Sequence, residues 1–234
     1  MFRSRLMMKF LLMITVVFSQ KPDWIIQAEK MINEQIIVRG VTDQNVLKVL
    51  STTPRHQFVP PEVAKYAYDD NPLPIGEGQT ISQPYIVARM TEMLMETGSM
   101  NKVLEIGTGC GYQTSILGKV AKTVFTVERI RALHMQARKT LTGIGQHNIQ
   151  YLFADGFNGW HQYAPFDGII VTAAPPSIPE KLVSQLADGG RMMIPVGSTE
   201  SSQDLILVQR KGTKIEETVI EKVKFVPLVS GVAR

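Results

Sequence analysis

Three closely spaced glycines in the middle of the chain could form a loop that holds a charged or nucleotide-like ligand. The apolar segment Val103–Ile106 reads as a buried strand and leads directly into Gly107-Thr108-Gly109-Cys110-Gly111. Glycines let the backbone approach a ligand closely, and the helix that follows offers free N–H groups at its N-terminus. A dinucleotide-binding loop has the spacing GxGxxG, whereas this chain has Tyr112 at the third glycine position. The spacing therefore disfavours a nicotinamide dinucleotide.

Three acidic residues accompany this loop at the ends of predicted strands. Glu105 lies two residues before the first glycine, where a carboxylate would repel a pyrophosphate and suits a ligand with an ammonium group. Glu128 closes the next strand, where it can accept both hydroxyls of a ribose. Asp155 follows the third strand and can meet an adenine amino group. Each acid alone could cap a helix, but their order and spacing together indicate S-adenosylmethionine.

The segment after the fourth predicted strand bears on the group that is methylated. Enzymes that methylate an exocyclic amine often place Asn or Asp before Pro-Pro at this point, and here Ala173-Ala174 precedes Pro175-Pro176. An anionic oxygen fits a site without such acceptors better. A carboxylate is already a nucleophile, so catalysis would consist of aligning its oxygen behind the methyl group and excluding water.

Candidate donors for that oxygen lie in Gln79-Thr80-Ile81-Ser82-Gln83-Pro84. Apolar residues at helical spacing follow, so Ser82 is also placed to be the N-cap of a helix with Pro84 in its first turn. The two roles are compatible, because a capping serine accepts through its oxygen and keeps its O–H free to donate. A helix N-terminus also favours an anion.

Metal and thiol chemistry find little support in the sequence. Cys110 is the single cysteine, which excludes an intramolecular disulfide and a zinc site built on several thiolates. The four histidines show no HExxH pattern or close pairing, so no metal is expected. Cys110 could be a nucleophile, but without a nearby histidine it is better explained as a small residue beside the ligand.

The charge of the chain is concentrated at its N-terminus. Residues 1–21 carry four basic residues and no acid, which leaves 21 basic and 21 acidic residues in the remainder. No basic stripe is visible, so nucleic-acid binding is not expected. A hydrophobic content of 44% with 20% charged residues is typical of a soluble globular protein.

Residues 1–19 resemble a secretory signal, with a basic start, the apolar run Phe10–Phe18 and a possible cleavage site at Val17-Phe18-Ser19. The apolar run is shorter than the ~20 residues that span a bilayer. A wrongly assigned start codon or an unstructured leader explains the segment equally well.

The rest of the chain, 22–234, reads as one domain, with a helical cap and substrate loop over 22–100 and a cofactor-binding sheet over 101–234. Short runs that are apolar throughout are typical of buried parallel strands. The expected strands are 103–106, 123–127, 149–153, 168–172 and 191–195; the expected helices between them are 112–120, 130–140 and 179–186; and a closing antiparallel hairpin is expected over 205–209 and 217–225. The sequence therefore predicts an α/β fold with a doubly wound, mostly parallel sheet.

Two helices are expected before the sheet. Asp23 can cap the first, which Gly40 ends. Thr42 or Asp43 can start the second, which Pro54 stops. The segment 58–78 is rich in Pro, Gly and Asp, so it is expected to be a structured loop.

Several segments together resemble the protein-L-isoaspartate (D-aspartate) O-methyltransferase family over about residues 54–228. The most specific are LPIGEGQTISQP (73–84) and VTAAP (171–175); RHQFVP (55–60), VLEIGTGCG (103–111), DGGR (188–191), IPVG (194–197) and FVPL (225–228) accompany them. The resemblance implies the class I S-adenosylmethionine-dependent methyltransferase fold. It also implies methyl transfer to the free α-carboxyl of L-isoaspartyl residues in damaged proteins, whose ester then collapses to a succinimide that hydrolyses partly to normal aspartyl.

The resemblance also implies roles for individual residues. Ser82 would be the active-site residue. The cofactor would be surrounded by Ile81, Glu105, Gly107, Gly109, Gly111, Glu128, Asp155 and Gly156, and the substrate peptide by Gln83, Ala174 and Val226. The N-terminal extension departs from the family pattern and leaves the compartment in doubt. A cytoplasmic location is expected because S-adenosylmethionine is made in the cytosol, with export as the alternative, and the protein is expected to be a monomer.

Two other functions remain open from the residues. A class I methyltransferase acting on another carboxylate or a small molecule would share the glycine loop and the strand-end acids, without needing GQTISQP (78–84) or VPL (226–228). A module that binds the cofactor without turnover is the second alternative, although the intact acids and Ser82 speak against it.

Overall fold

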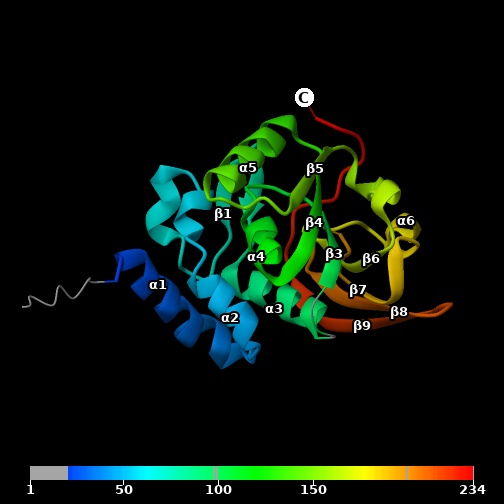
Figure 1. The fold of residues 1–234 in the computed structure, drawn as a ribbon, viewed down its shortest axis with the longest axis horizontal. Coiled ribbons are helices and arrows are strands. Elements are labelled where there is room, and N and C mark those ends of the chain that lie inside the picture. The colour runs from blue at the N-terminus through cyan, green and yellow to red at the C-terminus, as the bar shows by residue number, and fades with distance from the viewer. Residues whose placement is uncertain (1–20, 97, 99, 199, 234) are drawn as a thin grey trace, which may run out of the picture.

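A seven-stranded sheet forms the centre of the computed structural model, which describes residues 21–96, 98, 100–198 and 200–233 (Figure 1). The strand order is β5-β4-β3-β6-β7-β8-β9. Their bounds are β3 Met100–Ile106, β4 Ala121–Glu128, β5 Ile149–Phe153, β6 Phe166–Val171, β7 Leu186–Val196, β8 Gln203–Lys211 and β9 Lys214–Val223. The first five run parallel and the last two form antiparallel pairs, as the sequence predicts.

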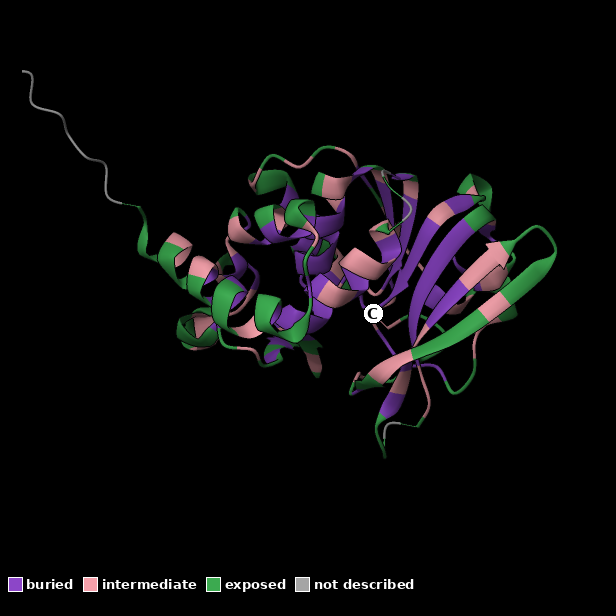
Figure 2. Cartoon of the chain, turned by 90° about the horizontal axis from the view of Figure 1, so that it is seen from below, coloured by how far each residue is buried: buried purple, intermediate pink, exposed green. Residues whose placement is uncertain are grey.

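Helices cover both faces of this sheet. One face packs against α3 (Pro84–Met95), α4 (Tyr112–Val120) and α5 (Arg131–Gly143), which share a hydrophobic core with the N-terminal helices. The other face packs against the short α6 (Glu180–Val183) and the aromatic segment around Trp160. Successive residues of β3, such as Val103 and Leu104, belong to opposite cores. Burial on both faces explains why these strands are apolar throughout (Figure 2).

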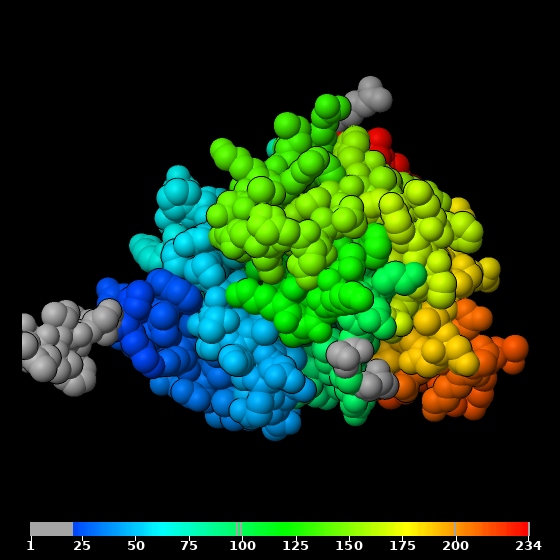
Figure 3. All heavy atoms as spheres, viewed as in Figure 1, coloured from blue at the N-terminus to red at the C-terminus, as the bar shows by residue number. Residues whose placement is uncertain are grey.

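The N-terminal cap is built from α1 (Asp23–Met31) and α2 (Gln44–Ser51). A π-helical turn, Ile32–Ile36, and a 3-10 turn, Ile37–Arg39, continue α1 to Gly40, whose φ of 90° ends it. Asp43 caps α2 by accepting from two backbone N–H groups, as expected. In Figure 3 this helical cap and the β8–β9 hairpin lie at opposite ends of the molecule.

Three details of the expected elements are wrong. Asp23 is the first residue of α1 and makes no capping bond, because Pro22 occupies the N-cap position. The helix α2 ends at Ser51, before Pro54 is reached. The helix expected over 179–186 is limited to Glu180–Val183, because Leu186 already pairs with Phe166 at the start of β7.

The segment expected to be a structured loop contains two 3-10 helices, η3 (Arg55–Phe58) and η4 (Pro61–Tyr66), and the strand β1 (Leu73–Gly76). β1 pairs with β2 (Gln79–Ile81) to form a separate two-stranded sheet. This small sheet carries the chain to the start of α3 and so places residues 79–83 beside the central sheet.

After β9, residues 225–233, here called the C-terminal strap, cross the edge of the central sheet towards α5 (red in Figure 1). Ala174 bonds the strap through its N–H to the Val226 carbonyl and through its carbonyl to the Leu228 N–H, both at 2.8 Å. Ala233 completes the attachment with backbone bonds to Arg129 and Arg131. The residues 1–19 of the signal-like segment lie outside the described residues, and no helix in the described part is long and apolar enough to cross a membrane.

Candidate active site

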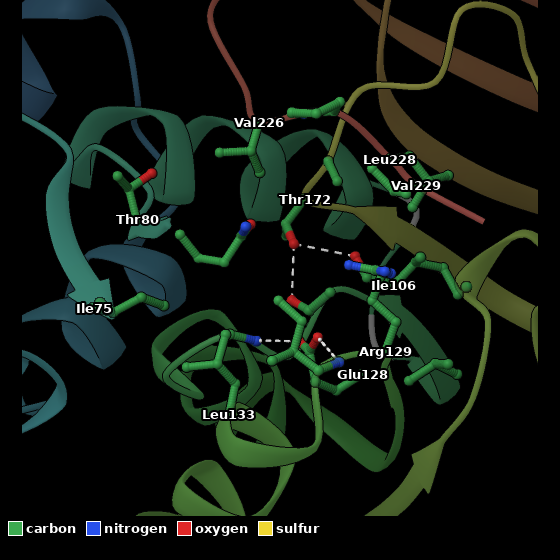
Figure 4. A pocket seen from close by; sticks show the side chains of 18 residues that line it. Ile75, Thr80, Ile106, Glu128, Arg129, Leu133, Thr172, Val226, Leu228 and Val229 are labelled. Atoms are coloured by element: carbon green, nitrogen blue, oxygen red, sulfur yellow. Dashed lines mark hydrogen bonds between the residues drawn. The ribbon is translucent and has the colours of Figure 1, made fainter. Parts of the chain in front are cut away.

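A cavity lies at the carboxyl ends of β3, β4 and β6, where parallel strands of such sheets place their ligands (Figure 4). We call it the glycine-loop cavity. Five parts of its wall surround the end of the central sheet: the loop 107–109, the turn 128–130, Gly156, Thr172–Ala173 and residues 226–229 of the C-terminal strap. The small sheet adds a sixth part with Ile75, Gln79 and Thr80. The topology therefore assembles one site from residues that are far apart in sequence.

The three glycines of the loop all have positive φ values, of 95° at Gly107, 54° at Gly109 and 89° at Gly111. A side chain at Gly107 would also collide with Thr172, whose Oγ1 would lie 2.3 Å from the added Cβ. Thr172 instead donates to the Gly107 carbonyl at 2.8 Å. The loop thus needs glycine for its backbone conformation as well as for the space it leaves.

Glu128 lies in the wall of the glycine-loop cavity and is 5% exposed. Its Oε2 accepts from the Gly109 N–H and its Oε1 from the Ile130 N–H, both at 2.9 Å (Figure 4). Each carboxylate oxygen can accept a further bond. The side chain therefore shapes the loop and can still accept from a ligand in the cavity, which is compatible with the expected ribose contact.

Replacing Glu128 with alanine is expected to weaken cofactor binding by about 10- to 100-fold, or roughly 1–3 kcal/mol. The change leaves the Gly109 and Ile130 N–H groups without their acceptor and removes the acceptor for the ribose hydroxyls. Calorimetric titration with S-adenosylhomocysteine measures the effect.

Glu92→Ala is the matched control, because the Glu92 carboxylate also accepts from two backbone N–H groups, those of Thr42 and Asp43, far from the cavity. This variant should lose stability and keep its cofactor Kd. Equal cofactor affinities in wild type and Glu128→Ala would remove Glu128 from the cofactor site.

Glu105 lies beneath the glycine loop and is fully buried. Its Oε2 accepts from the hydroxyls of Thr114 and Thr126, at 2.5 and 2.6 Å, while Oε1 has no partner among the described residues. Burial raises the pKa of this carboxyl to about 8, in spite of the two hydroxyl donors. Its side chain does not reach the wall of the cavity as described, so an effect on a cofactor ammonium group stays a prediction.

The raised pKa of Glu105 gives a pH dependence with a definite sign. Between about pH 4.5 and pH 8 the Glu105 carboxyl is protonated in the folded protein, whereas in the unfolded chain it has released its proton. The free energy of unfolding should therefore fall as pH rises through this window. Denaturant unfolding of the cofactor-free protein at several pH values measures it, and Glu105→Gln, which copies the neutral acid, should remove this part of the slope. Parallel profiles for the two proteins would contradict the assignment.

Asp155 uses both carboxylate oxygens within the protein. Oδ1 accepts from the Phe157 N–H at 2.9 Å and Oδ2 from the Gly231 N–H at 2.8 Å, so it ties the strap to the end of β5. Gly156 lines the glycine-loop cavity, and a Cβ there would lie 2.5 Å from the Ile106 side chain. The adenine contact expected of Asp155 stays a prediction, and a lone pair on each oxygen remains for it.

A second cavity, the serine cavity, has a volume of about 450 Å³ and adjoins the first. It is lined by Arg39, Ser82, Gln83 and Ile86 on one side and by residues 221–226 on the other. Thr80, Thr172 and Val226 line both cavities. A small third cavity joins Ser82 and Ile81 to the glycine loop and again includes Thr80 and Thr172.

Ser82 is not the N-cap of α3, which corrects the structural role expected for it. The N-cap is Gln83, whose side chain makes no capping bond, and Pro84 opens the helix as expected. The carboxylate of Asp70 reaches this helix end from a distant segment and accepts the Tyr85 N–H at 2.9 Å. The Ser82 hydroxyl has no hydrogen-bond partner among the described residues, so it is free to meet a ligand in the serine cavity.

The other expected site residues divide into two groups. Ile81 and Val226 lie in cavity walls, as does Gln83, whose amide also donates to Asp70. Ala174 lines none of the three cavities, and both of its backbone groups are used by the strap. It therefore positions Val226, and a contact of Ala174 with the substrate stays a prediction.

Cys110 is a buried residue in the wall of the small third cavity, and burial raises the pKa of its thiol to about 11. A thiol with such a pKa is protonated near neutral pH and is a poor nucleophile. The explanation of Cys110 as a small residue beside the ligand is therefore the better one. Among the described residues there is also no group of three acidic, histidine or cysteine side chains that could hold a metal ion.

Three residues that the structure places in or near the site have no individual role predicted from the sequence. Thr80 and Thr172 occur in the segments 79–84 and 171–175, but nothing in the sequence shows that they meet at the junction of the cavities. Asp70 caps α3 across 15 residues, and only the three-dimensional fold brings it there. A threonine as the last residue of a predicted strand was the one available signal for Thr172.

Comparison with known proteins gives a consistent picture. The model of the family described as protein-L-isoaspartate(D-aspartate) O-methyltransferase matches residues 26–233. A protein-L-isoaspartate O-methyltransferase of Shewanella denitrificans is 52% identical over 192 residues, which cover 82% of this chain and 90% of the relative. One of Nitrosococcus oceani is 53% identical over 190 residues, covering 81% and 89%.

Solved structures agree in fold. A protein-L-isoaspartate O-methyltransferase structure superimposes with a TM-score of 0.73 at 27% identity and covers 82% of this chain and 62% of that one. A Plasmodium falciparum structure, described as a putative protein-L-isoaspartate O-methyltransferase in complex with S-adenosyl-L-homocysteine, gives a TM-score of 0.74 at 22% identity and covers 88% and 98%.

Proposed function

This chain belongs to the protein-L-isoaspartate (D-aspartate) O-methyltransferase family, and we propose that its two adjoining cavities divide the reaction between cofactor and substrate. The enzyme transfers a methyl group from S-adenosylmethionine to the free α-carboxyl of L-isoaspartyl residues in damaged proteins. The resulting ester collapses to a succinimide, and this begins the repair.

The glycine-loop cavity fits S-adenosylmethionine by the chemistry of its walls. Glu128 offers acceptor capacity beside the loop, and Gly109 leaves space at a backbone that a side chain would fill. Ile106, Leu133 and Leu228 supply apolar surface for a flat ring. When bound, the cofactor supplies the sulfonium methyl group.

The serine cavity takes the isoaspartyl residue. Ser82 donates its hydroxyl hydrogen to one oxygen of the α-carboxylate, which fixes the other oxygen towards the methyl group. That oxygen forms the new O–CH₃ bond while the S–CH₃ bond breaks and its electron pair stays on sulfur. No proton has to move, because the acceptor is already ionised near neutral pH, with an ordinary pKa near ~4.

The single observation that carries this division is the position of Thr80 and Thr172, which line the glycine-loop cavity, the serine cavity and the small cavity between them. Methyl donor and acceptor would therefore meet at these two residues. The decisive experiment compares methyl incorporation into an isoaspartyl peptide and its aspartyl twin. Transfer to the isoaspartyl peptide alone is expected, whereas transfer to neither peptide would favour another carboxylate as the substrate.

We also infer that the enzyme acts as a cytoplasmic monomer. The cofactor is made in the cytosol, and described residues of a single chain form the walls of all three cavities. Light scattering tests the first prediction, because a monomer should have the molar mass of one chain in solution. Fractionation of the native host with N-terminal sequencing tests the compartment, and a mature chain beginning near Gln20 in an exported fraction would overturn it.

A further inference from the structure

Arg55 is a buried cation without a carboxylate partner, directly behind the proposed substrate site. It is 0% exposed and lies in the 3-10 helix η3. No ion pair joins it to an acid within the described part of the chain, and its Nη1 has no hydrogen-bond partner there. Taking a guanidinium out of water is costly unless it is paired and hydrogen-bonded, so its retention at this place needs a reason.

One of the contacts that Arg55 does make is with the backbone of Ser82. Its Nη2 donates to the Ser82 carbonyl at 2.6 Å and its Nε to the Ala67 carbonyl at 2.8 Å. The guanidinium carbon lies 4.6 Å from the centre of the Tyr112 ring, at the start of the helix that follows the glycine loop. Arg55 therefore connects Ser82 to the loop that forms the cofactor cavity.

The Ser82 carbonyl accepts from Arg55 at a position outside regular secondary structure. Ser82 lies between the end of β2 and the start of α3 and belongs to neither element. Neighbouring positions are held on both sides, because Ile81 pairs with Leu73 and the Gln83 carbonyl accepts the Val87 N–H. The hydrogen bond from Arg55 fixes the peptide group between Ser82 and Gln83.

We propose that Arg55 is a positioning residue, which holds the Ser82 peptide so that its hydroxyl meets the substrate carboxylate in line with the methyl group. The inference rests on the role proposed for Ser82. It also explains the charge, since the substrate brings an anion to Ser82 and so supplies the counter-ion that the protein lacks. Burial lowers the pKa of the guanidinium, yet arginine stays protonated at any pH at which the protein is folded.

The test is a double-mutant cycle on the full chain with an isoaspartyl peptide. Arg55→Lys keeps the charge but loses the planar fork that reaches two carbonyls. It is expected to lower kcat by about 10-fold or more, since small misplacements of reacting groups are costly. KM and the Kd for S-adenosylhomocysteine should change by less than about threefold. In the Ser82→Ala background the same substitution should change kcat by less than about twofold, because the group it positions is gone.

Arg191→Lys is the matched control. Arg191 is also a buried arginine, at 3% exposed, but it lies in β7 and pairs with Glu96 away from the cavities. It should lose stability with unchanged kcat. If Arg55→Lys fails to fold, Arg55→Met offers the same comparison without a buried charge. Proteins often tolerate the replacement of a buried charged residue by an apolar one of similar size.

Four outcomes separate the possibilities. Equal losses of kcat from Arg55→Lys in both backgrounds would overturn the inference and leave Ser82 in place. A loss of stability alone, like that of Arg191→Lys, would also overturn it. An unchanged kcat in Ser82→Ala would remove both Ser82 and Arg55 from the mechanism, whereas absence of methyl transfer by the wild type would overturn the function itself.

Discussion

Ser82→Ala is expected to lower kcat on an isoaspartyl peptide by about 10²-fold with little change in cofactor affinity. The hydroxyl fixes one carboxylate oxygen so that the other lies behind the methyl group, and misplacement by about 1 Å can cost this much. Because Ser82 orients the nucleophile and does not deprotonate it, the rate of the wild type should show no loss towards pH 6 that depends on this serine.

The structure sharpens this experiment, because Asp70 and not Ser82 accepts the N–H at the start of α3. A capping serine would cost about 1 kcal/mol of stability when removed, and Ser82→Ala should therefore leave the melting temperature nearly unchanged. Asp43→Ala is the matched control, since Asp43 does cap α2. It should lower the melting temperature and leave kcat unchanged. A destabilised Ser82→Ala with normal kcat would exclude the catalytic role.

Gly109→Val is expected to abolish measurable cofactor binding. Gly109 has a φ of 54°, which a β-branched residue rarely adopts, and its N–H donates to Glu128 in the wall of the cavity. The nearest neighbour of an added Cβ is the Ile75 side chain at 3.4 Å, so the protein itself leaves room there. The bulk of valine would instead fill the cavity that Ile75 and Gly109 share.

Gly212→Val separates this effect from backbone strain. Gly212 has a similar φ of 60° in the turn between β8 and β9, where nothing lies within 4 Å of an added Cβ. Both variants should lose stability, as measured by thermal unfolding. Only Gly109→Val should lose binding of S-adenosylhomocysteine by calorimetry, and normal binding there would show that the loop is not the cofactor site.

The accuracy of the sequence-based expectations follows from how local the determining interactions are. Ile149–Phe153 and Tyr112–Val120 were predicted with their observed bounds, because continuous apolar runs and a preceding glycine mark such elements within a few residues. Asp43 was one of the two residues expected to start α2, for the same reason. The family resemblance placed Ser82, Ile81, Gln83 and Val226 at cavity walls, which periodicity alone could not do.

The failures involve contacts between distant segments. The cap of α3 comes from Asp70, so local capping preferences pointed to Ser82 instead. The helix after Pro179 stops early because Leu186 is recruited into the sheet by Phe166. Arg55 lies in a recognised motif, but only the fold shows that it is buried against Ser82.

The C-terminal strap makes the site more fragile than the fold that carries it. Residues 226–229 form one wall of the cofactor cavity, yet they lie outside the central sheet, and the strap is attached through backbone bonds at Ala174 and Ala233 and through the Asp155 carboxylate. None of residues 225–233 is fully buried, and such a segment opens at a lower free energy than the core strands. On warming without cofactor, the strap should therefore open several degrees before the helices melt, and bound cofactor should close this interval because it stabilises the attached strap by mass action.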